Sequence, residues 1–113
     1  MKKVSFLMIS AFLTLSTCGK LAIEKDPPAC IQEKVSTFSK NSPCNDSSVE
    51  EYLFQGNIVY VFAMGSCGAD MGAEVIDYEC KDVGMLGGYF GITKINGVEF
   101  SKAKLIRTIW KKT

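Results

Sequence analysis

The 113 residues contain no histidine, and this absence narrows the chemistry open to the chain. Without an imidazole there is no Ser–His or Cys–His nucleophilic pair and no histidine-ligated zinc. Carboxylates remain, and five of them fall in one short stretch: Asp70, Glu74, Asp77, Glu79 and Asp82. Two carboxylates suffice for glycoside hydrolysis, so a small carboxylate-dependent hydrolase is the alternative that we keep open. Acids spread along a strand–turn–strand are more often a solvated rim, and they lack the Asp-x-Asp-x-Asp-Gly spacing of a calcium loop. We therefore expect no enzyme activity, no metal and no cofactor.

Cysteine is the second reactive residue type, and the chain has five. The last four, Cys30, Cys44, Cys67 and Cys80, are separated by 13, 22 and 12 residues, with no Cys-x-x-Cys pair. This spacing argues against a zinc site and against a thioredoxin-like redox site. We expect two structural disulfides, and the sequence allows three pairings of the four cysteines.

A glycine-rich segment, Gly84 to Gly91, carries two adjacent aromatic residues. It does not match a phosphate-binding loop, and its glycines are typical of a bulge or a turn with positive φ. Neighbours on a strand point to opposite faces, so we expect one of Tyr89 and Phe90 in the core and the other at the surface. The predicted contact patch comprises Met64, Met71, Met85, Tyr89 and Phe90.

The elements that position these residues begin after a leader. Two lysines follow Met1, and an apolar run extends from Val4 to Leu15 before the small residues Ser16 and Thr17. A transmembrane span needs about 20 apolar residues, so this pattern predicts a signal peptide over residues 1–17. Residues 18–26 then form a polar tether, and residues 27–113 a single domain.

The end of the leader, "LSTC", resembles the lipobox of bacterial lipoproteins. The resemblance implies that Cys18 becomes the new N-terminus and carries a lipid. The alternative is ordinary cleavage after Gly19, which discards Cys18 and yields a soluble periplasmic or secreted protein. Either route leaves an even number of cysteines, as expected for an exported protein.

One amphipathic helix follows the tether. Asp26 is the expected N-cap and Pro27 the first helical residue, because aspartate caps helices and proline is favoured at their first position. Ile31, Val35 and Phe38 recur at helical spacing and predict the buried stripe. Asn41-Ser42-Pro43 is expected to end the helix.

The remaining segments alternate as strands. Val49–Gln55 and Ile58–Ala63 flank Gly56-Asn57 and predict a hairpin. Further strands are expected over 74–77, 83–86 and 104–110, with a turn at Asn96-Gly97. The lysines of the last segment are typical of an edge strand. The predicted fold is α+β, with one N-terminal amphipathic helix packed on a four- to five-stranded antiparallel sheet and stapled by two disulfides.

Five segments, "PACIQEKVSTF", "VEEYLFQGNIVYVF", "CGADMGAEVIDYEC", "GMLGGYFG" and "KLIRTIW", occur in this order. Together they resemble a family of small, uncharacterised lipoprotein-type domains of Gram-negative envelopes, a domain of unknown function. The resemblance covers roughly residues 28–110 and implies an exported, cysteine-stapled α+β domain. It transfers no catalytic or binding residue.

Charge points to no nucleic acid partner. The chain carries 13 basic and 12 acidic residues, and loss of Lys2 and Lys3 with the leader leaves 11 against 12. No basic stripe is present. We expect a non-enzymatic binding or scaffolding module, exported and lipid-anchored to the bacterial envelope, at the outer membrane or the periplasmic face. Its expected partners are the membrane, through the lipid, and an envelope protein or glycan.

Overall fold

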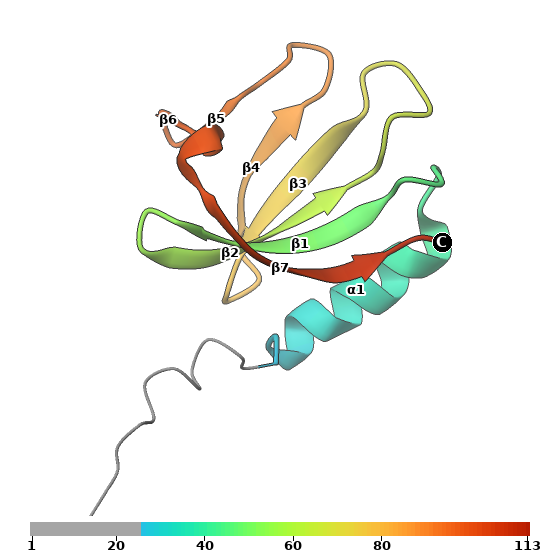
Figure 1. Ribbon diagram of the computed structural model, residues 1–113, viewed down its shortest axis with the longest axis horizontal. Coiled ribbons are helices and arrows are strands. Elements are labelled where there is room, and N and C mark those ends of the chain that lie inside the picture. Colours follow the sequence, from blue (N-terminus) through green and yellow to red (C-terminus); the bar gives the residue numbers. More distant parts are fainter. Residues whose placement is uncertain (1–25) are drawn as a thin grey trace, which may run out of the picture.

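The computed structural model describes residues 26–113. The expected signal peptide, Cys18 and all of the tether except Asp26 lie outside the described residues. One helix, α1 (Ala29–Asn41), lies against one face of a five-stranded antiparallel sheet (Figure 1). The strands of this sheet are β1 (Ser48–Phe54), β2 (Asn57–Ala63), β3 (Gly72–Asp77), β4 (Asp82–Gly87) and β7 (Lys104–Lys111). Their spatial order is β4-β3-β2-β1-β7, which confirms the predicted α+β fold.

Helix α1 begins two residues later than the sequence predicts. Pro28 is the N-cap residue, with a ψ of 157°, and no side chain caps the helix. The physical reason is the Pro27-Pro28 pair, because a residue that precedes proline avoids the helical conformation. Asp26 is therefore not the cap. The expected end is confirmed, since Ser42 is extended before Pro43.

The hairpin of β1 and β2 turns one position earlier than expected. Its central residues are Gln55 and Gly56, with φ of 51° and 79°, instead of Gly56 and Asn57. Positive φ at both positions is the signature of the type I′ turn that suits a two-residue hairpin. The resulting register places Glu51 opposite Tyr60.

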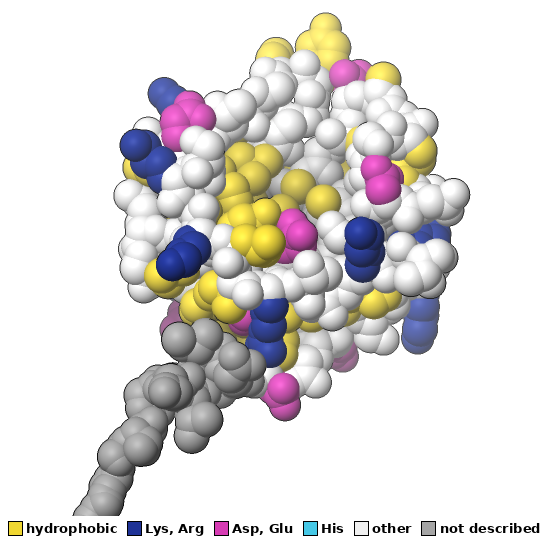
Figure 2. Space-filling model, viewed as in Figure 1, with side chains coloured by type: hydrophobic (Ala, Val, Ile, Leu, Met, Phe, Trp, Pro, Cys, Tyr) yellow, Lys and Arg dark blue, Asp and Glu magenta, His cyan; other side chains and the backbone are white. Residues whose placement is uncertain are grey.

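A buried hydrophobic cluster lies on each face of the sheet. On the helix side a cluster of Ile31, Val49, Tyr60, Phe62 and Ile76 is buried. On the other side Phe54, Val59, Val61 and Val75 are buried with Ile95. Ile95 comes from a small hairpin, β5 (Lys94–Ile95) and β6 (Val98–Glu99), which a 3₁₀ helix, η2 (Phe100–Lys102), joins to β7. Figure 2 shows hydrophobic side chains gathered in the hollow of the face turned to the viewer.

Two disulfides join segments that are distant in the sequence. Cys30 in α1 bonds to Cys80 in the β3–β4 turn, with a Cα–Cα distance of 6.3 Å. Cys44, just after the helix, bonds to Cys67 in the β2–β3 loop, with a Cα–Cα distance of 5.5 Å. Of the three pairings that the sequence allows, the structure has Cys30–Cys80 together with Cys44–Cys67. The first of these bridges holds the start of α1 against the β3–β4 turn.

Candidate functional site

Among residues 26–113, the exposed large hydrophobic side chains fall into two groups at different places on the domain. Met85, Tyr89, Phe90 and Ile92 belong to β4 and the loop that follows it. Leu53, Tyr78 and Leu105 line a groove beside the β1–β2 hairpin. Solvent-exposed hydrophobic groups of this kind mark contact sites in soluble domains. These two surfaces are the candidate sites.

The first surface is the aromatic loop, residues 87–92. Gly87 and Ile92 exchange two backbone hydrogen bonds, with the Gly87 amide 2.7 Å from the Ile92 carbonyl oxygen and the Ile92 amide 3.0 Å from that of Gly87. Inside this pair the Gly91 amide donates to Gly88 at 3.1 Å, which closes a tight turn. Positive φ at Gly87, Gly88 and Gly91 permits this path. The loop is therefore a hydrogen-bonded continuation of the sheet.

Tyr89 and Phe90 occupy the tip of that turn, and 78% and 82% of their surface is exposed. Their ring centroids are 5.1 Å apart and their planes meet at 83°, so the two rings form one edge-to-face knob. The expectation that one ring fills the core is wrong. Because the glycines make a turn here instead of a strand, neither ring is directed into the sheet. At the top of Figure 2, where Figure 1 places the β4–β5 loop, hydrophobic side chains project from the molecule.

The three methionines of the predicted contact patch lie near the base of the aromatic loop. The Met64 amide donates to the Gly72 carbonyl at 3.3 Å, and the Met71 carbonyl accepts from Gly88 at 3.3 Å. A Cβ on Gly72 would lie 3.2 Å from the Met85 sulfur. Only Met85 is well exposed; Met64 and Met71 are half-buried, and the Met71 sulfur lies 3.4 Å from that of Cys44. The structure thus brings the five residues to one end of the sheet and exposes three of them.

The second surface is the groove, a cavity of about 980 Å³. Its walls come from the β1–β2 hairpin, the β3–β4 turn and the start of β7. The lining residues are Glu51, Leu53, Gly56, Asn57, Ile58, Asp77, Tyr78, Glu79, Lys104, Leu105 and Ile106. The β3–β4 turn and the aromatic loop are at opposite ends of the β3–β4 hairpin, so the two surfaces lie at different ends of the domain (Figure 1).

Glu51 is the charged side chain that the sequence analysis missed. It is 4% exposed on β1, and its two carboxylate oxygens accept from different strands. The Tyr60 hydroxyl on β2 donates to Oε2 at 2.8 Å, and Arg107 Nε on β7 donates to Oε1 at 2.8 Å. Burial, and then the hydrogen bond and charge of Glu51, raise the pKa of Tyr60 well above its usual value. A sequence signal existed, because Glu51 lies two residues after Val49 and so shares a strand face with that buried apolar residue.

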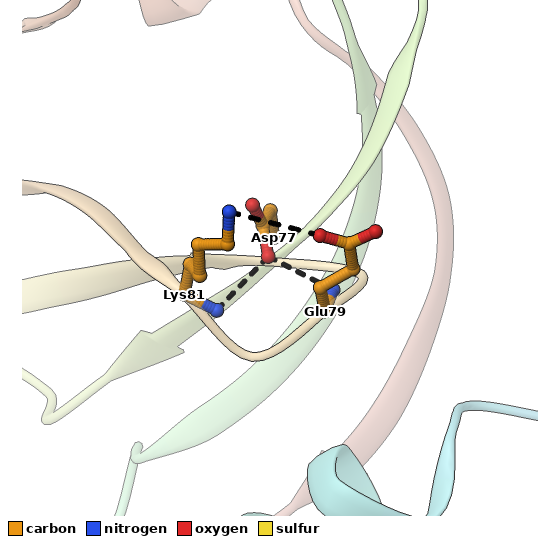
Figure 3. Close-up of polar contacts among 3 residues, drawn as sticks. All are labelled: Asp77, Glu79 and Lys81. Atoms are coloured by element: carbon orange, nitrogen blue, oxygen red, sulfur yellow. Dashed lines mark hydrogen bonds and ion pairs between the residues drawn. The ribbon is translucent and has the colours of Figure 1, made fainter.

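The β3–β4 turn at the groove rim is ordered by Asp77 (Figure 3). Its Oδ1 accepts from the amides of Glu79 at 2.8 Å and Lys81 at 2.9 Å, and its carbonyl oxygen accepts from Cys80 at 3.0 Å. The Lys81 ammonium lies 3.8 Å from Glu79 Oε1. The carboxylates that line the groove, Glu51, Asp77 and Glu79, are therefore each engaged by another group of the protein.

Within residues 26–113, no group of three or more Cys, Asp or Glu side chains is placed to hold a metal ion. In the same range, no helix is long and apolar enough to cross a membrane.

The fold and its two surfaces define a small, disulfide-stapled α+β domain that presents a convex aromatic knob and a concave groove. By sequence the chain belongs to the family described as a domain of unknown function (DUF6970), whose model matches residues 34–112. This confirms the resemblance to a domain of unknown function. No curated protein and no solved structure matches the chain.

Proposed function

We propose that the protein is an exported, non-enzymatic binding module of the bacterial cell envelope, anchored through a lipid on Cys18, and that it contacts its partner with the aromatic loop. One observation carries this proposal: Tyr89 and Phe90 are 78% and 82% exposed on a loop held by its own backbone hydrogen bonds. Aromatic side chains that are exposed and already ordered lose little conformational entropy on binding, which is why they are enriched at contact sites.

Two disulfides support the export part of the proposal. Structural disulfides persist in oxidising compartments and are rare in the reducing cytosol. Both bridges join segments far apart in the chain, 50 and 23 residues, so they stabilise the domain as a whole. The leader pattern and the lipobox resemblance of the first 18 residues point in the same direction.

The engagement of the groove carboxylates favours binding over hydrolysis. A carboxylate-dependent hydrolase needs two carboxyl groups directed at the substrate. Here Glu51 is bonded to Tyr60 and Arg107, and Asp77 accepts from two amides of its own turn. These side chains stabilise the sheet and the turn, and the aromatic loop carries the binding function.

The test replaces Phe90 with a photo-crosslinking amino acid in the full chain, within its native envelope. A matched chain carries the same replacement at Ser36, an exposed position on α1. We expect discrete crosslinked species from position 90 that are absent from position 36. Equal labelling from both positions, or none from position 90, would contradict a contact role for the loop.

A further inference from the structure

The two hydrophobic surfaces of the domain are complementary in shape. The aromatic loop is a narrow projection with two rings at its tip, whereas the groove is a depression lined by apolar side chains, Leu53, Ile58, Tyr78, Leu105 and Ile106, and by charged ones. Sites that hold drug-sized molecules have volumes of about 300–1,000 Å³. With about 980 Å³, the groove has room for one tyrosine and one phenylalanine side chain.

We propose that the aromatic loop of one copy docks in the groove of a second copy, so that copies of this chain associate head to tail. The inference rests on the proposed binding function and names a second copy as the partner. Because the knob and the groove are different surfaces, the contact is heterologous. Such contacts repeat into rings or open rows instead of closing as a symmetric dimer.

Polar groups on the two surfaces match as well. A buried tyrosine hydroxyl needs a hydrogen-bond partner, and the carboxylates of Asp77 and Glu79 line the groove. The exposed ammonium of Lys94 follows the aromatic loop by two residues, while the groove lining carries three carboxylates, Glu51, Asp77 and Glu79, against one ammonium, Lys104. Opposite charges placed in this way favour the docked orientation.

The contact is small, and this sets its strength. Two aromatic side chains bury about 300–500 Å² between them. With a similar area on the groove side, the total remains below the roughly 1,200 Å² typical of stable specific interfaces. We therefore expect weak association that becomes significant where copies are concentrated, as anchored chains on one membrane are. Eight residues separate Cys18 from Pro27 and reach at most about 28 Å, which leaves the domain room to lie along the membrane.

The experiment uses two full-length copies with different tags, produced together in the native envelope. The first copy carries the photo-crosslinking amino acid at position 90. The second copy is wild type, a groove variant (Leu53→Asp/Leu105→Asp), a knob variant (Tyr89→Ser/Phe90→Ser) or a control (Lys111→Asp). Leu53 and Leu105 are 41% and 51% exposed, so their replacement is compatible with folding. Lys111→Asp places the same new side chain on the last strand outside the groove.

We expect a crosslinked species that carries both tags and whose crosslinked peptide includes groove residues of the second copy. Its yield should fall about tenfold or more with the groove variant, because a desolvated aspartate opposes docking. It should persist with the knob variant and the control. The crosslinked peptide of the wild-type pair gives this answer even if the groove variant does not fold.

Head-to-tail docking would be overturned if no doubly tagged species formed. It would also be overturned if the crosslinked peptide of that species came from outside the groove, or if the groove variant did not lower its yield. If position 90 then crosslinks only to other proteins, the proposed binding function stands and the self-association does not. If position 90 crosslinks to nothing, both are wrong.

Discussion

Glu51 is held inside the sheet by partners on both neighbouring strands, and this arrangement makes it sensitive to the loss of either. Removing a carboxylate from water is costly unless hydrogen bonds and an opposite charge compensate. The Tyr60 hydroxyl and the Arg107 guanidinium supply that compensation at 2.8 Å each. The cluster therefore also fixes the floor of the groove, because Glu51 lines it.

Tyr60→Phe should reveal this cluster through the pH dependence of stability. At pH 7 the loss of one donor to Glu51 should lower the free energy of unfolding by about 1–3 kcal/mol. The raised pKa of Tyr60 means that the folded protein keeps this proton to a higher pH than the unfolded chain, in which tyrosine titrates near pH 10. Wild-type stability therefore falls above about pH 10, and the difference from Tyr60→Phe should narrow there. Urea unfolding of both proteins at pH 7–11 measures this difference in the free energy of unfolding. A difference that stays constant over this pH range would refute the role given to the Tyr60 hydroxyl.

Tyr89→Ser and Phe90→Ser should each change the free energy of unfolding by no more than about 0.5 kcal/mol, because both rings are exposed. Phe62→Ala is the matched comparison. Phe62 is 3% exposed in the helix-side cluster, and its truncation should cost about 3–5 kcal/mol. Urea unfolding of the three variants distinguishes surface from core. A loss above about 2 kcal/mol at either loop position would show that its ring packs against the sheet.

At the scale of elements, the two edges of the sheet are formed by β4 and β7. Strand β7 carries exposed Lys104 and Lys111, which confirms the edge-strand interpretation, since lysines there discourage strand pairing between molecules. Strand β4 continues into the aromatic loop. One edge is thus protected by charge, and the other leads into the candidate contact surface.

The disulfides should contribute according to the length of chain that each closes. Loop-closure entropy predicts about 4 kcal/mol for Cys30–Cys80, which spans 50 residues, and about 3 kcal/mol for Cys44–Cys67, which spans 23. The variants Cys30→Ala/Cys80→Ala and Cys44→Ala/Cys67→Ala should lose these amounts of free energy of unfolding in urea titrations. The oxidised wild type is the reference. A loss below about 1 kcal/mol for either pair would mean that the bridge stabilises the fold little.

At the scale of the whole molecule, disulfides and the cover on both sides of the sheet act together. A short chain buries a limited core, and disulfides offset that limit. The helix covers one face of the sheet, and the β5–β6 hairpin with η2 covers part of the other. Within residues 26–113, the large hydrophobic side chains that remain exposed belong to the aromatic loop, β4 and the groove.

Cys18→Ser should separate an anchored protein from a soluble one. A single acyl chain gives only marginal membrane binding, while two or more hold a protein stably. We expect wild-type protein in the detergent phase of a detergent partition, and the variant either released or left as an uncleaved precursor. Mass spectrometry of the mature N-terminus identifies the lipid. Cleavage after Gly19 in the wild type would contradict lipidation.

The sequence alone determined the features that depend on local pattern. Helical spacing of Ile31, Val35 and Phe38 located α1, and alternating residues located the principal strands. The Asn96-Gly97 turn is confirmed by φ of 52° and 80° at its two residues. These elements were predictable because side-chain periodicity and backbone sterics act over a few residues. The boundaries of the elements were less predictable, as the later start of α1 and the shifted β1–β2 turn show.

Tertiary structure decided what depends on contacts between distant segments. Four equivalent thiols carry no information about pairing, so only the packing of α1 on the β3–β4 turn selects Cys30–Cys80. Glu51 and Arg107 are 56 residues apart and meet because β7 pairs with β1. The groove exists only where three such segments converge. Both aromatic rings are exposed because they lie at the tip of the turn that the hydrogen bonds between Gly87 and Ile92 enclose, a conformation that the composition of the loop permits but does not specify.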